Sequence, residues 1–122
     1  MKPPKTRCGG LWSESRFASF IKSALRGASN RWGPKHNARK AARTGRNRYS
    51  CALCHATVGN KDIAIDHINP VVDPVRGFVS WDEYIARMFC EQDGFRAICR
   101  TCHDKVTAEQ REVRKANKKP PH

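Results

Sequence analysis

Apolar residues recur at helical spacing early in the chain, directly after Ser13. Ser13 suits an N-cap, and Glu14 places a negative charge in the first turn. The apolar positions follow the i, i+3, i+4, i+7 pattern of one helix face: Phe17, Phe20, Ile21, Ala24, Leu25 and Ala28. A Trp-Gly-Pro run at 32–34 ends this pattern. These residues predict an amphipathic surface helix that packs on a core.

Further helices are predicted along the rest of the chain. A short basic helix over 34–44 begins with proline, which favours the first helical position, and is followed by a glycine that stops it. Ser80 and Glu83 have the spacing of a capping box in front of an apolar helix over 81–90. From about Thr101 the chain can form one long helix or a turn followed by a helix, and both alternatives remain open.

Two short segments have the character of strands. Residues 63–65 are an apolar run after a turn-forming segment at 59–62, and residues 95–98 follow Gly94. Prolines and a glycine between 70 and 77 predict a loop in the intervening stretch. Short strands mixed with helices indicate an α+β fold.

Four of the six cysteines form two C-x2-C pairs, Cys51 with Cys54 and Cys99 with Cys102. Each pair makes a tight turn that lets two sulfurs reach one ion, so the pairs predict one tetrahedral structural zinc. A disulfide framework is the alternative, but the first five residues lack the apolar region of a signal peptide, which favours a reducing compartment and zinc. The cysteines outside the pairs are Cys8 and Cys90.

Positive charge dominates the composition, with 24 Lys and Arg against 11 Asp and Glu and a formal net charge of +13. This excess predicts a polyanionic partner, with nucleic acid favoured over a membrane surface. No apolar run approaches the roughly 20 residues of a membrane-spanning helix. The charge is densest over 35–48, where the alternative is a solvated connector. The residues expected to contact DNA are Lys22, Arg26, Arg31, Lys35, Arg39, Lys40, Arg43, Arg46, Arg48 and Lys105.

Three residues near the predicted zinc site are candidates for chemistry. Asp66 and His67 stand side by side at the end of a predicted strand, and His103 follows the last paired cysteine. Because side chains alternate along a strand, one of the first two can hold a metal ion while the other faces a substrate, provided that the chain bends there. His103 can supply a second ligand, and such a site suits phosphodiester hydrolysis by a metal ion and a neutral histidine. The alternative is a polar strand end without chemistry.

Together these segments resemble the zinc-bearing HNH endonuclease motif, with the first cysteine pair followed by Ile65-Asp66-His67-Ile68-x-Pro70 and by Ile98-Cys99-x2-Cys102-His103. The motif covers about residues 49–107, and most of the chain is similar to small HNH proteins of bacteriophages. The resemblance implies a ββα-metal fold, in which a two-stranded hairpin and a helix clasp one catalytic divalent ion. It implies that His67 is the general base and that Asp66 and His103 bind Mg²⁺, Mn²⁺ or Ni²⁺. It also implies that the four paired cysteines hold a separate structural Zn²⁺.

One position departs from the family pattern. The middle asparagine of the motif, which usually braces the loop between the strands, is replaced here by Gly94, with Asp93 beside it. Asp93 can take over this role, or a backbone carbonyl can orient His67 alone. Lys105 also stands one position early relative to the family, and it either contacts phosphate or is a solvated helix charge.

We expect one domain over residues 1–122. Its parts are a basic leader at 1–11, a basic helical DNA-contacting segment at 12–48, an HNH core at 49–107 with an inserted helix at 81–90, and a helix end with a basic tail at 108–122. This organisation gives a small ββα-metal core that is stabilised by a four-cysteine zinc site, with additional N-terminal and inserted helices.

The predicted function is a metal-dependent endonuclease that hydrolyses phosphodiester bonds of double-stranded DNA, as a monomer or homodimer in the cytoplasm of a host cell. A single active site leaves nicking and a dimeric double-strand cut both open. The main alternative is a zinc-stabilised nucleic-acid-binding module without catalysis, which has no need of Asp66, His67 and His103 together. A zinc-stabilised protein-interaction module is a third alternative, but it leaves the charge of +13 without a role.

Overall fold

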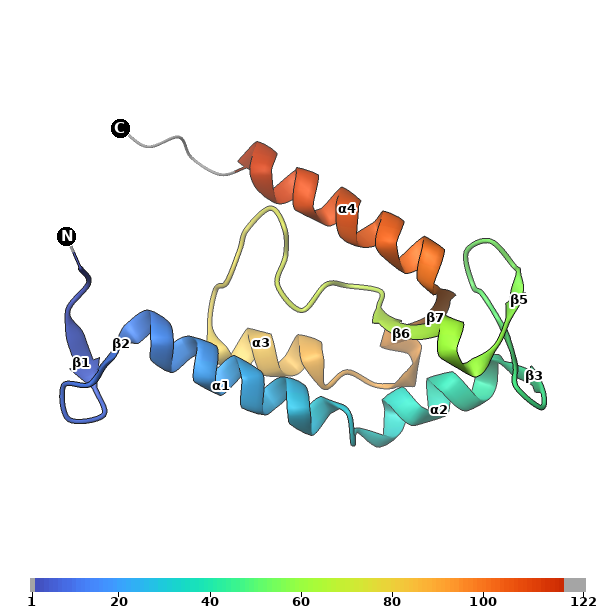
Figure 1. Cartoon of the computed structure of the whole chain (residues 1–122), viewed down its shortest axis with the longest axis horizontal. Coiled ribbons are helices and arrows are strands. Elements are labelled where there is room, and N and C mark those ends of the chain that lie inside the picture. Colours follow the sequence, from blue (N-terminus) through green and yellow to red (C-terminus); the bar gives the residue numbers. More distant parts are fainter. Residues whose placement is uncertain (1, 118–122) are drawn as a thin grey trace. The chain divides into compact units, whose positions relative to one another are not determined.

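The computed structural model describes residues 2–117 of the 122-residue chain. The chain divides into two compact units, Met1–Arg31 and Trp32–His122 (Figure 1). The end of the predicted basic tail, residues 118–122, lies outside the described residues. One helix with one hairpin has too little apolar surface to form a stable domain alone, so the expectation of a single domain over 1–122 stays a prediction.

The first unit opens with a two-stranded hairpin, although the sequence predicted a loose leader at 1–11. Strand β1 (Lys5–Arg7) pairs antiparallel with β2 (Trp12–Ser13). Between them the backbone is left-handed at Gly9 and Gly10, with φ of 63° and 87°. Glycine adopts these angles without steric cost, which permits the tight reversal. The prediction of a loose leader was therefore wrong for the strand residues.

The helix predicted after Ser13 forms as α1 (Glu14–Ser29). Ser13 is its N-cap, and the side-chain oxygen accepts a hydrogen bond from the backbone N–H of Arg16 at 3.2 Å. The Arg7 guanidinium of the hairpin donates to the carboxylate of Glu14 at 2.7 Å. This ion pair fastens the hairpin to the first turn of the helix.

The second unit begins with α2 (Gly33–Ala42), which has Pro34 in its first turn as predicted. A three-stranded antiparallel sheet follows, in the order β3 (Arg43–Gly45), β4 (Arg48–Ser50) and β5 (Thr57–Val58). Strands of two or three residues carry too little alternation to be recognised in a sequence. The helix predicted over 34–44 therefore ends slightly earlier than expected, at Ala42, because Arg43 and Thr44 belong to β3.

A hairpin of two strands that lie far apart in the sequence forms the centre of the second unit. The predicted strands are confirmed as β6 (Ile63–His67) and β7 (Phe95–Cys99), which pair antiparallel over their whole length. Short 3-10 turns lead into them, η1 (Asn60–Asp62) and η2 (Gln92–Gly94). The two strands therefore meet only after the chain has passed through residues 68–94.

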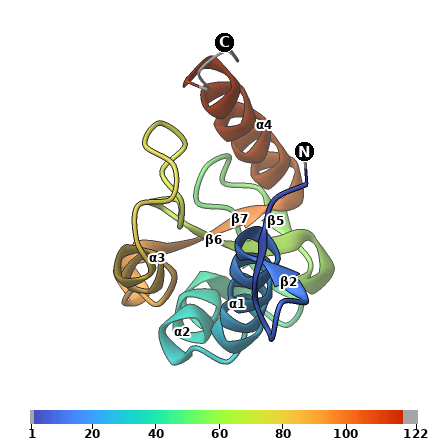
Figure 2. The same ribbon diagram turned by 90° about the vertical axis from the view of Figure 1, so that its left-hand side faces the viewer.

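Two helices complete the second unit. The predicted inserted helix forms as α3 (Trp81–Met88), and the Ser80 side chain caps it by accepting from the Glu83 backbone N–H at 3.1 Å. The last helix, α4 (Arg100–Asn117), is continuous, so the alternative of a turn followed by a helix is wrong. Helices α4 and α2 lie on opposite sides of the β6–β7 hairpin (Figures 1 and 2).

The core of the second unit gathers around the paired cysteines. Cys51 and Ile98 have no exposed surface, and Cys99 and Cys102 are buried beside them. A core of this size gives little apolar burial, so a metal clip would contribute much of its stability. Within residues 2–117, every helix is too short or too polar to cross a membrane.

Candidate metal centre and catalytic site

Four cysteines converge at one end of the β6–β7 hairpin, hereafter the Cys99 end. Cys51 follows β4, Cys54 lies in the next turn, Cys99 ends β7 and Cys102 stands in the first turn of α4. Their sulfur atoms all lie within 4.8 Å of one another. The predicted pairs therefore form one cluster that can bind a metal such as zinc.

Both cysteine pairs have the local geometry of a metal-binding turn. The backbone N–H of Cys54 points at the sulfur of Cys51 at 3.5 Å, and that of Cys102 points at the sulfur of Cys99 at 3.4 Å. The first turn is fixed to the hairpin because the Ala52 N–H donates to the Ala97 carbonyl at 2.8 Å. In each pair a backbone N–H thus points at the first sulfur, which is the arrangement that a metal-binding turn requires.

The thiols of the cluster differ in acidity. Burial raises the pKa of Cys51, but hydrogen bonds from the backbones of Cys54, Cys99 and Leu53 together outweigh it, and the pKa falls to about 6. A hydrogen bond to the side chain of Cys99, followed by burial, raises the pKa of Cys102 to about 12. Several thiolates in so small a space repel one another, and a cation between them would remove this cost. Four thiolates that require a compensating cation are a donor set that fits Zn²⁺.

The opposite end of the hairpin carries Asp66 and His67, and it is called the Asp66 end below. In the strand register Asp66 lies opposite Arg96, and His67 lies opposite Phe95. Directly opposed residues share a face of the sheet, so Asp66 and His67 lie on opposite faces, as predicted.

The face of Asp66 is the one that α4 covers. Ile98 shares this face with Arg96, because the two are separated by one residue of β7, and Val106 of α4 packs against the core that contains Ile98. His103 is half-buried and stands three residues before Val106, which places both on the same side of the helix. Asp66 and His103 therefore belong to the layer between the hairpin and α4. Among the described residues no hydrogen bond or ion pair joins them to each other.

Arg96 is the direct partner of Asp66, and it was not among the predicted site residues. Its Nη2 and Nε groups donate to Asp66 Oδ2 at 3.2 and 3.4 Å. The side chains are 24% and 16% exposed, so the pair is half-buried. The pair could be found only by aligning β6 with β7. The long segment between the two strands prevents that alignment from being read from the sequence.

A backbone carbonyl holds His67 in place. The Nε2 atom of its imidazole lies 2.9 Å from the carbonyl oxygen of Met88, at the end of α3, and the ring packs on Phe95 with 4.7 Å between centroids. A carbonyl only accepts hydrogen bonds, so this contact requires the proton on Nε2 and leaves the Nδ1 lone pair available. Orientation of His67 by a carbonyl is one of the two alternatives that the sequence left open.

Gly94 has a packing reason to be glycine. A Cβ atom there would lie 2.6 Å from the Cys90 sulfur, so the side chain of an asparagine does not fit. The Gly94 carbonyl accepts a hydrogen bond from the Ile68 N–H at 2.9 Å, which extends the pairing of the hairpin by one step. The backbone of Gly94, instead of a side chain, thus ties down the loop next to His67.

The predicted DNA-contacting residues differ in how free they are. Arg39 is engaged within the second unit, where it donates to the Asn60 carbonyl at 3.1 Å and lies over the Tyr49 ring at 4.8 Å. Lys22 and Lys35 are half-buried. Those that stand exposed are Arg26, Arg31, Lys40, Arg43, Arg46, Arg48 and Lys105.

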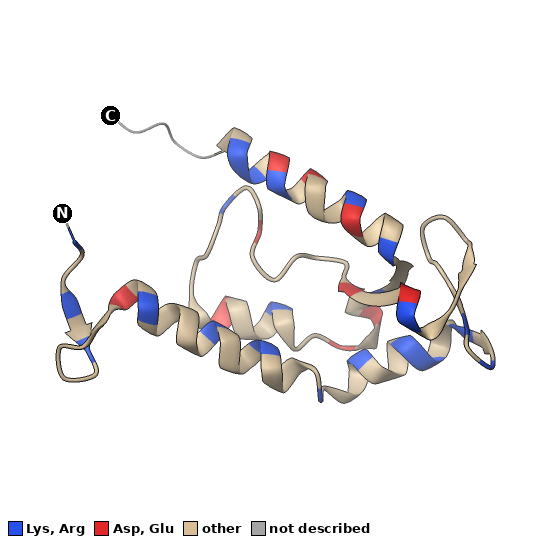
Figure 3. Ribbon diagram, in the orientation of Figure 1, with Lys and Arg blue, Asp and Glu red and all other residues tan. Residues whose placement is uncertain are grey.

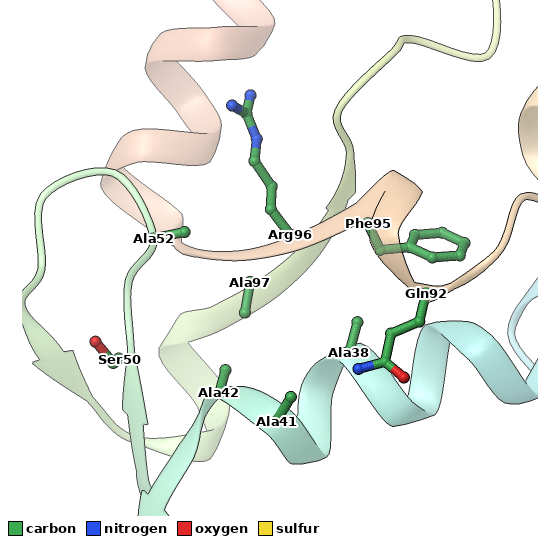
Figure 4. Close-up of a pocket in the computed structure, with 9 residues that line it drawn as sticks. All are labelled: Ala38, Ala41, Ala42, Ser50, Ala52, Gln92, Phe95, Arg96 and Ala97. Carbon is green, nitrogen blue, oxygen red and sulfur yellow. The ribbon is translucent and has the colours of Figure 1, made fainter.

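A pocket of about 320 Å³ lies on the α2 side of β7. Alanines make most of its lining, including Ala38, Ala42 and Ala97, and Figure 4 shows the Arg96 side chain extending away from them. The pocket therefore lies on the other side of the strand from the Asp66 carboxylate, and its apolar lining offers no metal ligand.

Comparisons of the chain with protein families, curated proteins and solved structures give no match. The chemistry of the two ends of the hairpin therefore has to be judged from their own donor atoms. One end offers four clustered sulfurs, three of them on buried cysteines, and the other offers the Asp66 carboxylate, the His67 imidazole and the Arg96 guanidinium.

Proposed function

We propose that the protein is a metal-dependent DNA endonuclease of the HNH type. The observation that carries this proposal is the sequence of elements around Asp66 and His67, in which an antiparallel hairpin is followed directly by a helix that covers one of its faces. This is the order that a ββα-metal motif requires. The cluster of four cysteines at the Cys99 end supports the same assignment.

Asp66 and His103 are the proposed ligands of the catalytic ion. A carboxylate and an imidazole suit a hard or borderline divalent ion such as Mg²⁺, Mn²⁺ or Ni²⁺. The fit is supported by the free oxygen of Asp66, because among the described residues no hydrogen bond reaches its Oδ1. When bound, the ion supplies positive charge that stabilises the phosphate and the leaving oxygen.

His67 is the proposed general base. Its Nδ1 takes a proton from a water molecule, whose oxygen attacks the phosphorus of the scissile phosphodiester. The bond between phosphorus and the 3′ oxygen breaks, and that oxygen takes a proton from solvent. The products are a 5′-phosphate and a 3′-hydroxyl. The hydrogen bond to the Met88 carbonyl supports this role, since it fixes both the ring orientation and the tautomer.

Positive charge on both units supports DNA as the substrate. The sequence contains no Asp or Glu between Glu14 and Asp62, whereas Lys and Arg recur throughout that stretch. Figure 3 shows α2 with basic residues and no acidic ones. Such a distribution binds phosphates with little regard to base sequence.

A second candidate function is nucleic-acid binding without catalysis, on a zinc-stabilised scaffold. The ion pair between Asp66 and Arg96 favours it, because a guanidinium on the carboxylate competes with a metal ion. The glycine at position 94 in place of the family asparagine favours it as well.

Plasmid cleavage by the zinc-loaded protein separates the two functions. We expect Mg²⁺ or Mn²⁺ to support cleavage, and we expect a brief treatment with EDTA to stop it. The variant His67→Ala should cleave about 10²- to 10⁴-fold more slowly, the usual contribution of a general base, while it binds DNA as tightly as wild type. His36→Ala, an exposed histidine on α2, is the matched control and should cleave normally. Tight binding without cleavage in any metal would instead establish the non-catalytic module.

A further inference from the structure

Arg96 is a charged residue in a place where strand residues are usually apolar. It lies on the face of the β6–β7 hairpin that α4 covers, and it shares this face with Ile98 and Asp66. Its side chain is nevertheless 24% exposed, so part of it reaches solvent. Long cationic side chains achieve this by burying the aliphatic stem and leaving the head in water.

The contact between Arg96 and Asp66 is loose. Ion pairs between a guanidinium and a carboxylate typically have distances of about 2.7–2.9 Å, whereas the two distances here are 3.2 and 3.4 Å. Both donors also point at the same oxygen, Oδ2, and among the described residues no hydrogen bond reaches Oδ1 of Asp66. A pair that served only to hold the strands together would be expected to use both oxygens in the bidentate manner that arginine favours.

We infer that Arg96 is a phosphate-contacting residue of the active site, which Asp66 holds until a divalent ion takes over the carboxylate. This inference rests on the proposed endonuclease function. Without the ion, the guanidinium neutralises Asp66. With the ion bound, like charges repel, and Arg96 turns to the nearest remaining anion, the scissile phosphate. Its planar fork of N–H donors matches two phosphate oxygens.

Substitution of Arg96 is expected to raise metal affinity and to lower the cleavage rate. Arg96→Met keeps an unbranched side chain but removes the charge that competes for Asp66, so the variant should bind Mn²⁺ roughly five- to tenfold more tightly. The same variant should cleave DNA about 10²- to 10³-fold more slowly, because one donor to the developing charge is lost. A merely structural role would lower metal affinity and cleavage together.

The experiment measures Mn²⁺ binding by electron paramagnetic resonance on full-length, zinc-loaded protein, together with single-turnover cleavage. Arg87→Met is the matched control, because Arg87 of α3 is also half-buried and its guanidinium lies 3.9 Å from the carboxylate of Asp73. It should change neither quantity. Arg96→Lys keeps the charge and loses the fork, so it should bind Mn²⁺ like wild type and cleave at least tenfold more slowly, which preserves the test if the methionine variant does not fold.

A third measurement separates failure of this inference from failure of the proposed function. Affinity for DNA is measured with and without Ca²⁺, and we expect Ca²⁺ to raise it in wild type and not in Arg96→Met. If wild type never cleaves, yet the Mn²⁺ and Ca²⁺ effects appear, the endonuclease proposal fails and the role of Arg96 as a metal-released phosphate contact holds. If wild type cleaves and Arg96→Met cleaves equally fast, or loses Mn²⁺ affinity, the inference about Arg96 is overturned and the endonuclease proposal stands.

Discussion

The two ends of the β6–β7 hairpin have the same backbone pairing and opposite chemistry. At the Cys99 end, Cys51, Cys99 and Cys102 are at most 9% exposed, and the sulfurs lie within 4.8 Å of one another. At the Asp66 end, Asp66 and His67 are half-buried, and Asp66 contacts the half-buried Arg96. Three of the four cysteines at the Cys99 end are buried and Cys54 is exposed, whereas Asp66 and His67 at the other end are both half-buried.

Under the proposed function, this difference would let one small hairpin carry both a structural metal site and a catalytic one. Structural metal sites are closed, with every position filled by protein, whereas catalytic sites keep a position open. Soft sulfurs and hard oxygen and nitrogen donors also prefer different ions, so the two ends need not compete for one metal. Substitutions at the Cys99 end should therefore change folding, and those at the Asp66 end should change activity.

The largest effect is expected from breaking the Cys99 end. Cys99→Ser should abolish stoichiometric zinc binding and unfold the second unit, because structural zinc contributes about 10–16 kcal/mol in small zinc domains, as much as the whole stability of a typical domain. Zinc content by mass spectrometry and helicity by circular dichroism test this. Cys8→Ser, at an exposed cysteine outside the cluster, should have neither effect. A folded, zinc-free Cys99→Ser protein would refute the structural role.

A smaller effect is expected where the loop meets the Asp66 end. Gly94→Ala places a Cβ atom 2.6 Å from the Cys90 sulfur and 3.0 Å from the Cys90 Cβ, so it should lower the free energy of unfolding by about 1–3 kcal/mol. Combining it with Cys90→Ala should restore part of this loss, as urea titration of the zinc-loaded protein can show. Gly27→Ala, on α1 with open space around it, is the control and should be neutral or slightly stabilising. Full stability of Gly94→Ala would contradict the packing reason for this glycine.

The smallest effect on stability is expected at Asp66 itself. Asp66→Asn keeps the size of the side chain and removes a half-buried, loose ion pair, so the free energy of unfolding should change by less than about 1 kcal/mol. Cleavage dependent on Mg²⁺ should nevertheless disappear. Thermal unfolding and plasmid cleavage on the same preparation measure both. A large loss of stability would mean that the Asp66 end is structural, and the contrast between the two ends would then be lost.

Features that depend on a few neighbouring residues were predictable from the sequence. Ser13 and Ser80 cap the helices that follow them, because a hydroxyl before an amphipathic run has one nearby N–H to satisfy. The cysteine pairs form turns for the same local reason, and their equal spacing indicated that they would share one site. Strand character at 63–65 and 95–98 was visible in short apolar runs.

Features that depend on the register between distant residues were not predictable. Arg96 could be assigned to Asp66 only once β6 was aligned with β7. Arg39 looked like a free cation in the sequence, but Asn60 and Tyr49 come to it from other elements. In the sequence, Gly94 stands where the HNH motif has an asparagine. The proximity of Cys90 that explains the glycine is a tertiary contact. Local patterns fix caps and turns, whereas such contacts follow from the assembled fold.

The long connecting segment between β6 and β7 has a consequence for the order in which the chain folds. A loop of residues 68–94 replaces the tight turn of an ordinary hairpin, and its closure costs roughly 2 kcal/mol more chain entropy. The strands therefore gain little by meeting alone, and long-range pairing of this kind is intrinsically slow. An ion that joins Cys51 and Cys54 to Cys99 and Cys102 closes the chain at the far end of the same strands. Binding of that ion can thus nucleate the pairing of β6 with β7, after which Asp66 and His67 pair in register with β7.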